Sequence, residues 1–94
     1  MPRYKVAHLN QQGVDLIIVP LESSFGAQGQ QSQNAEHNLL QLKANGAGLK
    51  GTVVPVWDNG GGRMGFLAPP NFHPYFQSIN LQFVMGNINR EIYW

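Results

Sequence analysis

The chain has 94 residues, a formal net charge of +1 and only 12% charged residues. Such a weakly charged chain argues against binding to nucleic acid or to an anionic membrane, and its longest apolar stretch, residues 16–21, is far too short to cross a bilayer. The absence of cysteine excludes disulfide bonds, thiolate nucleophiles and cysteine-based metal sites, and the length fits one domain, which we expect to be cytoplasmic.

The first part of the chain predicts a β-hairpin. Residues 3–9 alternate as a strand does, residues 10–13 form a turn, and residues 14–21 form a second strand. The second strand is apolar on both faces from Leu16 onward. We therefore expect both faces of its sheet to be covered.

A helix is predicted after a loop over residues 22–31. Ser32 is a candidate helix cap, and the apolar residues that follow recur at helical spacing, namely Ala35, Leu39 and Leu42, with Leu40 broadening the stripe. Asn45-Gly46 then closes a helix over residues 32–44, because either residue accepts the left-handed conformation at a helix end. We expect this stripe to face the sheet, with Leu39 buried in the core beside Ile17, Ile18 and Val54.

A glycine-rich run separates the next two predicted strands, residues 52–57 and 63–68. The run reads Asp58-Asn59-Gly60-Gly61-Gly62-Arg63. A turn with positive φ needs glycine or asparagine, so the run is predicted to connect a hairpin. Pro69-Pro70 ends the fourth strand, since proline cannot donate to a β-ladder.

The last part of the chain allows two interpretations. A helix over residues 74–89 is favoured by its length, by Pro74 at its first turn and by apolar residues at helical spacing. A strand over residues 79–85 is the alternative, because apolar side chains alternate there and are rich in aromatic and β-branched types.

The predicted fold is therefore an α/β (α+β) domain of order ββαββα, with a four-stranded mixed sheet and two helices. The second and third strands are joined through a helix, which predicts a right-handed crossover between parallel strands. Two strands are apolar on both faces. Either the helices cover opposite faces, or they share one face and a second copy of the chain covers the other.

Polar residues follow the carboxyl ends of the two parallel strands. In open α/β sheets, ligands usually bind at this edge. The candidate ligand-binding residues are Glu22, Ser23, Ser24, Asp58, Asn59, Gly60, Gly61 and Arg63. Arg63, the loop amides and the serine hydroxyls suit a small anionic ligand. The competing interpretation is a hairpin turn whose Arg63 pairs with Asp58 or Glu22. Residues 60–65 contain neither a Walker loop nor a dinucleotide fingerprint.

No metal site or cofactor is predicted, and no catalytic residue can be named. The three histidines, His8, His37 and His73, fall on separate elements without metal-ligand spacing. A serine, a histidine and Asp58 could be combined into a catalytic set, but no GxSxG elbow supports it.

The leading functional hypothesis is a non-catalytic interaction or regulatory protein that acts as a homodimer. The segment Ile92-Tyr93-Trp94 is unusually apolar for a chain end, and a second subunit could cover it. A fold-back of the segment onto its own sheet is the alternative cover. The second hypothesis is a small enzyme or ligand-binding protein with its site at the glycine-loop edge.

Overall fold

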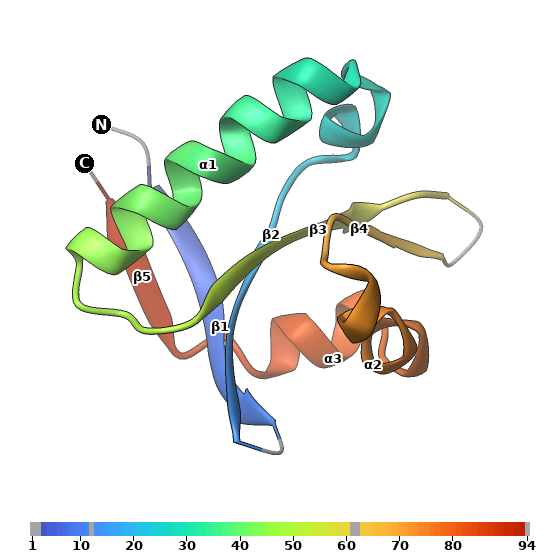
Figure 1. Ribbon diagram of the computed structural model, residues 1–94. Helices are drawn as coiled ribbons and strands as arrows, with labels where there is room; N and C mark the ends of the chain where they lie inside the picture. The colour runs from blue at the N-terminus through green and yellow to red at the C-terminus, as the bar shows by residue number, and fades with distance from the viewer. Residues whose placement is uncertain (1–2, 12, 61–62, 94) are drawn as a thin grey trace.

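The computed structural model describes residues 3–11, 13–60 and 63–93. The predicted site residue Gly61 and the predicted interface residue Trp94 lie outside these ranges. Gln12 and Gly62, which belong to the two predicted turns, lie outside them too. The strands and α-helices follow in the order β1 (Arg3–Gln11), β2 (Val14–Pro20), α1 (Gln30–Gly46), β3 (Thr52–Asp58), β4 (Met64–Phe66), α2 (His73–Ser78), α3 (Leu81–Gly86) and β5 (Arg90–Tyr93) (Figure 1). Two 3-10 helices, η1 (Ser23–Ala27) and η2 (Pro70–Phe72), lie in the connections.

One mixed sheet with strand order β4-β3-β2-β1-β5 organises the described residues. β2 and β3 are parallel, with Ile18 opposite Val54, and α1 forms the crossover between them. The other neighbouring strands are antiparallel. The α+β class, both predicted hairpins and the parallel crossover are confirmed. The predicted four strands and two helices are too few, because the carboxyl-terminal part forms two short helices and β5.

The helices cover opposite faces of the sheet, which resolves the two arrangements left open by the sequence (Figure 1). On one face, α1 contributes Leu40 and Ala44 to a buried cluster with residues of β1, β2, β3 and β5. On the other face, Phe76 of α2 and Val84 of α3 pack on a second buried cluster. The core residues Ile17, Ile18 and Val54 are fully buried, as predicted.

The predicted inward stripe of α1 is wrong for Ala35, Leu39 and Leu42 and confirmed only for Leu40. Leu40 and Ala44 are fully buried, whereas 37% of Leu39 and 68% of Leu42 are exposed, and Ala35 is exposed too. The helix is rotated because its inward face is held by polar side chains that bond to backbone, among them His37 and Gln41. Apolar periodicity cannot detect such a face, because its contacts are hydrogen bonds.

These polar side chains close the open edge of β3. β4 pairs only with the last three residues of β3, which leaves the first half of that edge without a strand. There the His37 Nε2–H donates to the Val53 carbonyl at 2.7 Å, and the Val53 N–H donates to the Gln41 Oε1 at 2.8 Å. The Gln41 amide also donates to the Gly51 carbonyl at 2.9 Å. Helix α1 therefore replaces a missing strand neighbour with side chains.

The helix favoured for residues 74–89 forms only in part, as two short helices, α2 and α3, and the alternative strand does not form. α2 ends at Ser78, and Ile79 is extended with φ −114° and ψ 170°. α3 then begins after Asn80, whose side-chain oxygen accepts a hydrogen bond from the Phe83 N–H at 2.8 Å. This is an N-cap, and it favours a new helix over continuation of the old one. Neither the long helix nor the strand over residues 79–85 forms.

The carboxyl-terminal segment folds back onto its own sheet as β5. It pairs with the start of β1, so that Ile92 lies opposite Tyr4 and Tyr93 opposite Arg3. The Asn89 side chain extends this pairing, because its oxygen accepts from the His8 N–H at 2.8 Å and its amide donates to the His8 carbonyl at 2.9 Å. Across the described ranges, no helix is long and apolar enough to span a membrane.

Candidate functional site

The glycine-rich run lies between two antiparallel strands, β3 and β4, as its sequence predicts. Gly60 has a φ of +86°, a conformation that glycine adopts without strain. The Asn59 N–H donates to the Arg63 carbonyl at 2.9 Å, and the Arg63 N–H donates to the Gly60 carbonyl at 3.0 Å. The Asp58 carboxylate accepts from the Gly60 N–H at 2.9 Å, so it already has a partner inside the turn. In the described part of the chain, the side chain of Arg63 forms no ion pair with Asp58 or Glu22.

The predicted ligand-binding residues divide between two hollows. Glu22 and Ser24 line one of about 520 Å³, together with Arg3, Tyr4 and Glu36. Asp58 and Arg63 line another of about 200 Å³, together with Asn80, Leu81 and Gln82. Ser23 follows β2 and Asn59 follows β3, at the same edge of the sheet as predicted.

An aromatic pair packs η1 onto the end of β3, near the strand ends that the predicted site needs. Phe25 of η1 is buried, and its ring centroid lies 5.1 Å from that of Trp57. Trp57 in turn packs between Gly26 and Gly65, where a methyl group on either glycine would overlap the indole ring. Side chains therefore fill space at this edge that the sequence prediction leaves free for a ligand.

The larger of these hollows carries more negative than positive side chains. Among its described lining residues, Glu22 and Glu36 face a single cation, Arg3, whose Nη1 lies 3.8 Å from Glu91 Oε1. The Tyr4 hydroxyl donates to Glu36 Oε1 at 3.1 Å, and burial together with this carboxylate raises the pKa of Tyr4. An anion entering beside Ser24 would therefore meet two carboxylates.

Each of the three histidines forms a hydrogen bond with a backbone carbonyl of another segment. His8 bonds to the Lys50 carbonyl at 2.8 Å, and His73 bonds to the Ala68 carbonyl at 3.0 Å, as His37 does to Val53. A carbonyl can only accept, so Nε2 of each ring carries a proton in these bonds. Among the described residues, no group of three or more histidine, aspartate and glutamate side chains could hold a metal ion.

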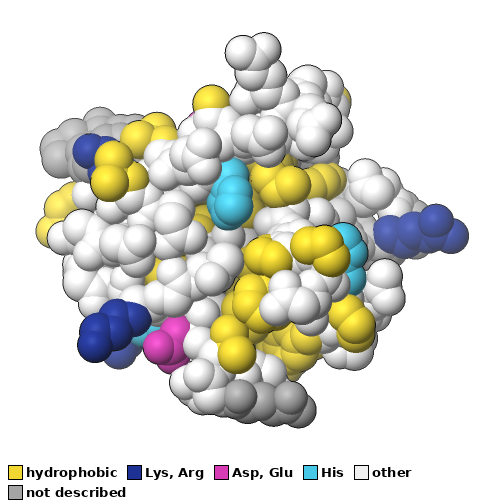
Figure 2. All heavy atoms as spheres, in the orientation of Figure 1, with side chains coloured by type: hydrophobic (Ala, Val, Ile, Leu, Met, Phe, Trp, Pro, Cys, Tyr) yellow, Lys and Arg dark blue, Asp and Glu magenta, His cyan; other side chains and the backbone are white. Residues whose placement is uncertain are grey.

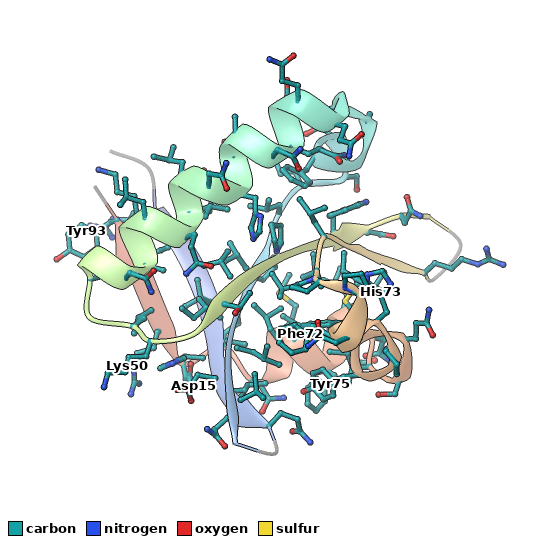
Figure 3. All side chains as sticks on the ribbon, in the orientation of Figure 1. Asp15, Lys50, Phe72, His73, Tyr75 and Tyr93 are labelled. Carbon is teal, nitrogen blue, oxygen red and sulfur yellow. The ribbon has the colours of Figure 1, made fainter. Side chains whose placement is uncertain are left out.

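Sequence reasoning missed a hollow of about 520 Å³ between the β1–β2 hairpin and α2. Its described lining residues carry no charge and are Gln11, Val14, Leu16, Asn71, Phe72, Pro74 and Tyr75. Figure 2 shows hydrophobic side chains gathered where η2 and α2 lie in Figure 1, and Figure 3 labels Phe72 and Tyr75 there. The Tyr75 hydroxyl is buried with no hydrogen-bond partner among the described residues, and its burial raises the pKa of Tyr75. The hollow joins segments far apart in the sequence, so no local pattern could reveal it.

The outer edge of β5 lies beside Leu42, one of the two exposed leucines of α1. Leu42, Lys43, Gly46 and Ala47 line a hollow of about 390 Å³ with Tyr93 of β5. Tyr93 is 61% exposed at the outer side of β5 (Figure 3), whereas Ile92 is only 1% exposed and belongs to the core of its own chain. Of the predicted interface segment, Tyr93 is thus the described residue that a partner could reach.

Comparison of the chain with protein-family models, with curated proteins and with solved structures finds no match.

Proposed function

We propose that this protein is a small interaction protein that acts as a homodimer, with the outer edge of β5 and the neighbouring flank of α1 as its interface. The observation that carries the proposal is the orientation of α1. This helix turns Leu39 and Leu42 toward solvent and His37 and Gln41 toward the sheet. An amphipathic helix in a monomer normally does the opposite.

Burial of Leu39 and Leu42 against a second subunit would stabilise the dimer. Fully burying a leucine stabilises by roughly 1.5–3 kcal/mol, and Leu42 is 68% exposed in the single chain. Leu39 precedes Leu42 by three residues and therefore lies on the same side of the helix. A small domain leaves much of its surface in water, so a second subunit is an effective cover.

The two edges of the sheet differ in a way that favours β5. The first half of the β3 edge is closed by His37 and Gln41, and β4 spans only three residues. Within the described residues, no strand lies beyond β5. An edge strand presents backbone donors and acceptors that can pair with another strand. A second copy offers the same edge and the same leucines, so one interface satisfies both chains about a two-fold axis.

Sedimentation velocity of matched variants tests this interface. Leu42→Glu places a charge on the exposed flank of α1, where the fold of the single chain should tolerate it. We expect the wild type to sediment as a dimer at micromolar concentration and Leu42→Glu as a monomer. The control is Phe83→Glu, because Phe83 is 41% exposed on α3 and stands at the third helical position, where glutamate is favourable.

Two results would count against the interface. One is a dimer that survives Leu42→Glu unchanged. The other is equal loss of the dimer in Leu42→Glu and Phe83→Glu, which would point to a general effect of added charge. Circular dichroism of both variants shows whether each keeps its fold.

The alternative proposal, a small enzyme or ligand-binding protein with an anion site at the glycine loop, rests on Arg63. This side chain is exposed beside the hollow of about 200 Å³ and forms no ion pair with a described carboxylate. Calorimetric titration with phosphate and acetate tests it. Binding that disappears in Arg63→Ala would favour this alternative, and absence of binding to the wild type would remove it.

A further inference from the structure

We infer that two β5 strands pair antiparallel with Ile92 opposite Ile92 of the second copy, which joins the two sheets into one continuous sheet. This register rests on the proposed homodimer and specifies the contact that forms it. It follows from the position of each β5 side chain relative to the faces of the sheet and from the charges on those side chains.

Symmetry leaves few registers to choose from. A two-fold axis perpendicular to the sheet makes neighbouring edge strands antiparallel and keeps every side chain on its own face. Successive side chains in a strand alternate between faces. Each β5 residue can therefore lie opposite itself or opposite a residue an even number of positions away. The registers that use the described strand are centred on Arg90, Glu91, Ile92 or Tyr93.

Charge and overlap separate these registers. Centring on Arg90 or on Glu91 places two like charges directly opposite each other, which destabilises a strand pair. Centring on Tyr93 pairs only one residue of β5 (Arg90–Tyr93) with β5 of the second copy, so this register forms the shortest contact between the two elements. Centring on Ile92 places Glu91 opposite Tyr93 of the second copy and avoids both problems.

The neighbouring β1 strands strengthen the same register. Within one chain, Lys5 lies opposite Glu91 and Arg3 lies opposite Tyr93. Arg3 also sits 5.9 Å from the centre of the Tyr93 ring. The row across the joined sheet then reads Lys5, Glu91, Tyr93 of the second copy and Arg3 of the second copy. Positive, negative, aromatic and positive side chains follow one another, so no two like charges are adjacent.

The opposite face of the joined sheet receives the helices. Ile92 lies under α1 in the same buried cluster as Leu40 and Ala44. The two-fold axis keeps both α1 helices on this face, one on each side of the Ile92 pair. The hollow between Leu42 and Tyr93 lies along the edge where the second β5 would add, so the added strand would lie beside the exposed flank of α1.

Cysteine cross-linking tests the register cleanly, because the chain contains no cysteine of its own. Glu91→Cys and Tyr93→Cys chains, one of them carrying a mass tag, are mixed and oxidised. Directly opposite residues have Cα atoms about 4.5–5.5 Å apart, which suits a disulfide. We expect the mixed disulfide, which joins a Glu91→Cys chain to a Tyr93→Cys chain, to exceed both homodimeric disulfides, because identical positions lie about 7–8 Å apart on the diagonal.

Each other outcome has a defined meaning. A dominant disulfide between two Glu91→Cys chains overturns this register and leaves the proposed dimer intact. The reference rate is that of Gln82→Cys, which carries its cysteine at an exposed position on α3. If the wild type sediments as a dimer but the β5 cysteines cross-link no faster than this reference, pairing through β5 is overturned. A monomeric wild type removes both the register and the proposed function.

Discussion

Trp57 lies between two glycines whose lack of a side chain makes room for its ring. A methyl group on Gly65 or on Gly26 would overlap the indole. Trp57 is only 9% exposed and its ring also contacts Phe25, so it has little freedom to move. These contacts fix the end of β3 against η1 and β4.

We expect Gly65→Ala to lower the free energy of unfolding by about 1–3 kcal/mol, because it overpacks a filled site. Urea unfolding followed by far-ultraviolet circular dichroism measures this loss. The control is Gly86→Ala, since a methyl group there would meet no atom within 4 Å. Equal stability of the two variants would show that Trp57 is free to shift.

Tyr75 carries a buried hydroxyl without a hydrogen-bond partner among the described residues. Burial raises its pKa above the ordinary value of 10.0, so the folded state resists ionisation. The contribution of Tyr75 to stability is therefore complete below pH 10.0 and is lost as the pH rises toward its folded pKa.

We expect Tyr75→Phe to raise the free energy of unfolding at neutral pH by about 1 kcal/mol, because it removes an unsatisfied buried group. It should also reduce the loss of stability above pH 10.0, while Tyr4 keeps its own raised pKa. Urea unfolding at neutral and alkaline pH measures both effects. A variant less stable than the wild type at neutral pH would indicate that the hydroxyl has a partner in solution.

The closure of the β3 edge depends on Gln41, which satisfies both a donor and an acceptor of the backbone. Gln41→Leu leaves the N–H of the fully buried Val53 without a partner. We expect a cost of about 1–3 kcal/mol, together with faster aggregation through the opened edge. Denaturant unfolding and light scattering measure the two effects.

Gln31→Leu is the matched control for this substitution, because Gln31 is exposed in the first turn of the same helix. If both variants behaved like the wild type, the side-chain bonds to β3 would not matter for stability, and the orientation of α1 would need another cause.

The two adjacent leucines of α1 should respond differently to truncation. Leu40 is fully buried, so Leu40→Ala should cost roughly 2–5 kcal/mol through the cavity that it leaves. Leu39→Ala should cost less than about 1 kcal/mol in the single chain. In a dimer, its remaining cost should depend on protein concentration, since association stabilises by mass action.

Thermal and urea unfolding at several protein concentrations measure this difference. A larger cost for Leu39→Ala than for Leu40→Ala at low concentration would mean that α1 faces the sheet with the stripe that periodicity predicts.

The sequence predicts the elements whose signals are local. The β1–β2 hairpin, the glycine turn before β4 and the crossover from β2 to β3 follow from alternation, turn residues and apolar strands. The orientation of α1 does not follow from such signals. His37 and Gln41 are polar, so the sequence alone predicts that they lie at the surface, and only the fold shows that they bond to β3. The break at Ile79 has a local signal, the capping residue Asn80, which apolar spacing masks.

The candidate sites depend on contacts across the whole molecule, which explains why they are harder to predict. The shared edge of Ser23 and Asp58 follows from parallel strands, and this part of the prediction holds. The division into two hollows follows from side-chain packing that no sequence spacing encodes. β5 is short, and its position beside β1 depends on the fold-back through α2 and α3.

At the level of the whole molecule, an open sheet edge and an outward apolar helix flank occur side by side. Each feature alone is common on protein surfaces, and their proximity is what favours a second copy of the chain. The dimer would also explain why α1 commits its inward face to polar bonds. The outward residues Leu39 and Leu42 would then be buried between chains, while Leu40 and Ala44 stay in the core of their own chain.

Sedimentation equilibrium of the wild-type protein across the micromolar range tests this dimer most directly. We expect the measured mass to be twice that of one chain and to fall toward that of one chain only on dilution. A mass equal to one chain throughout this range would contradict the dimer and the function proposed for it.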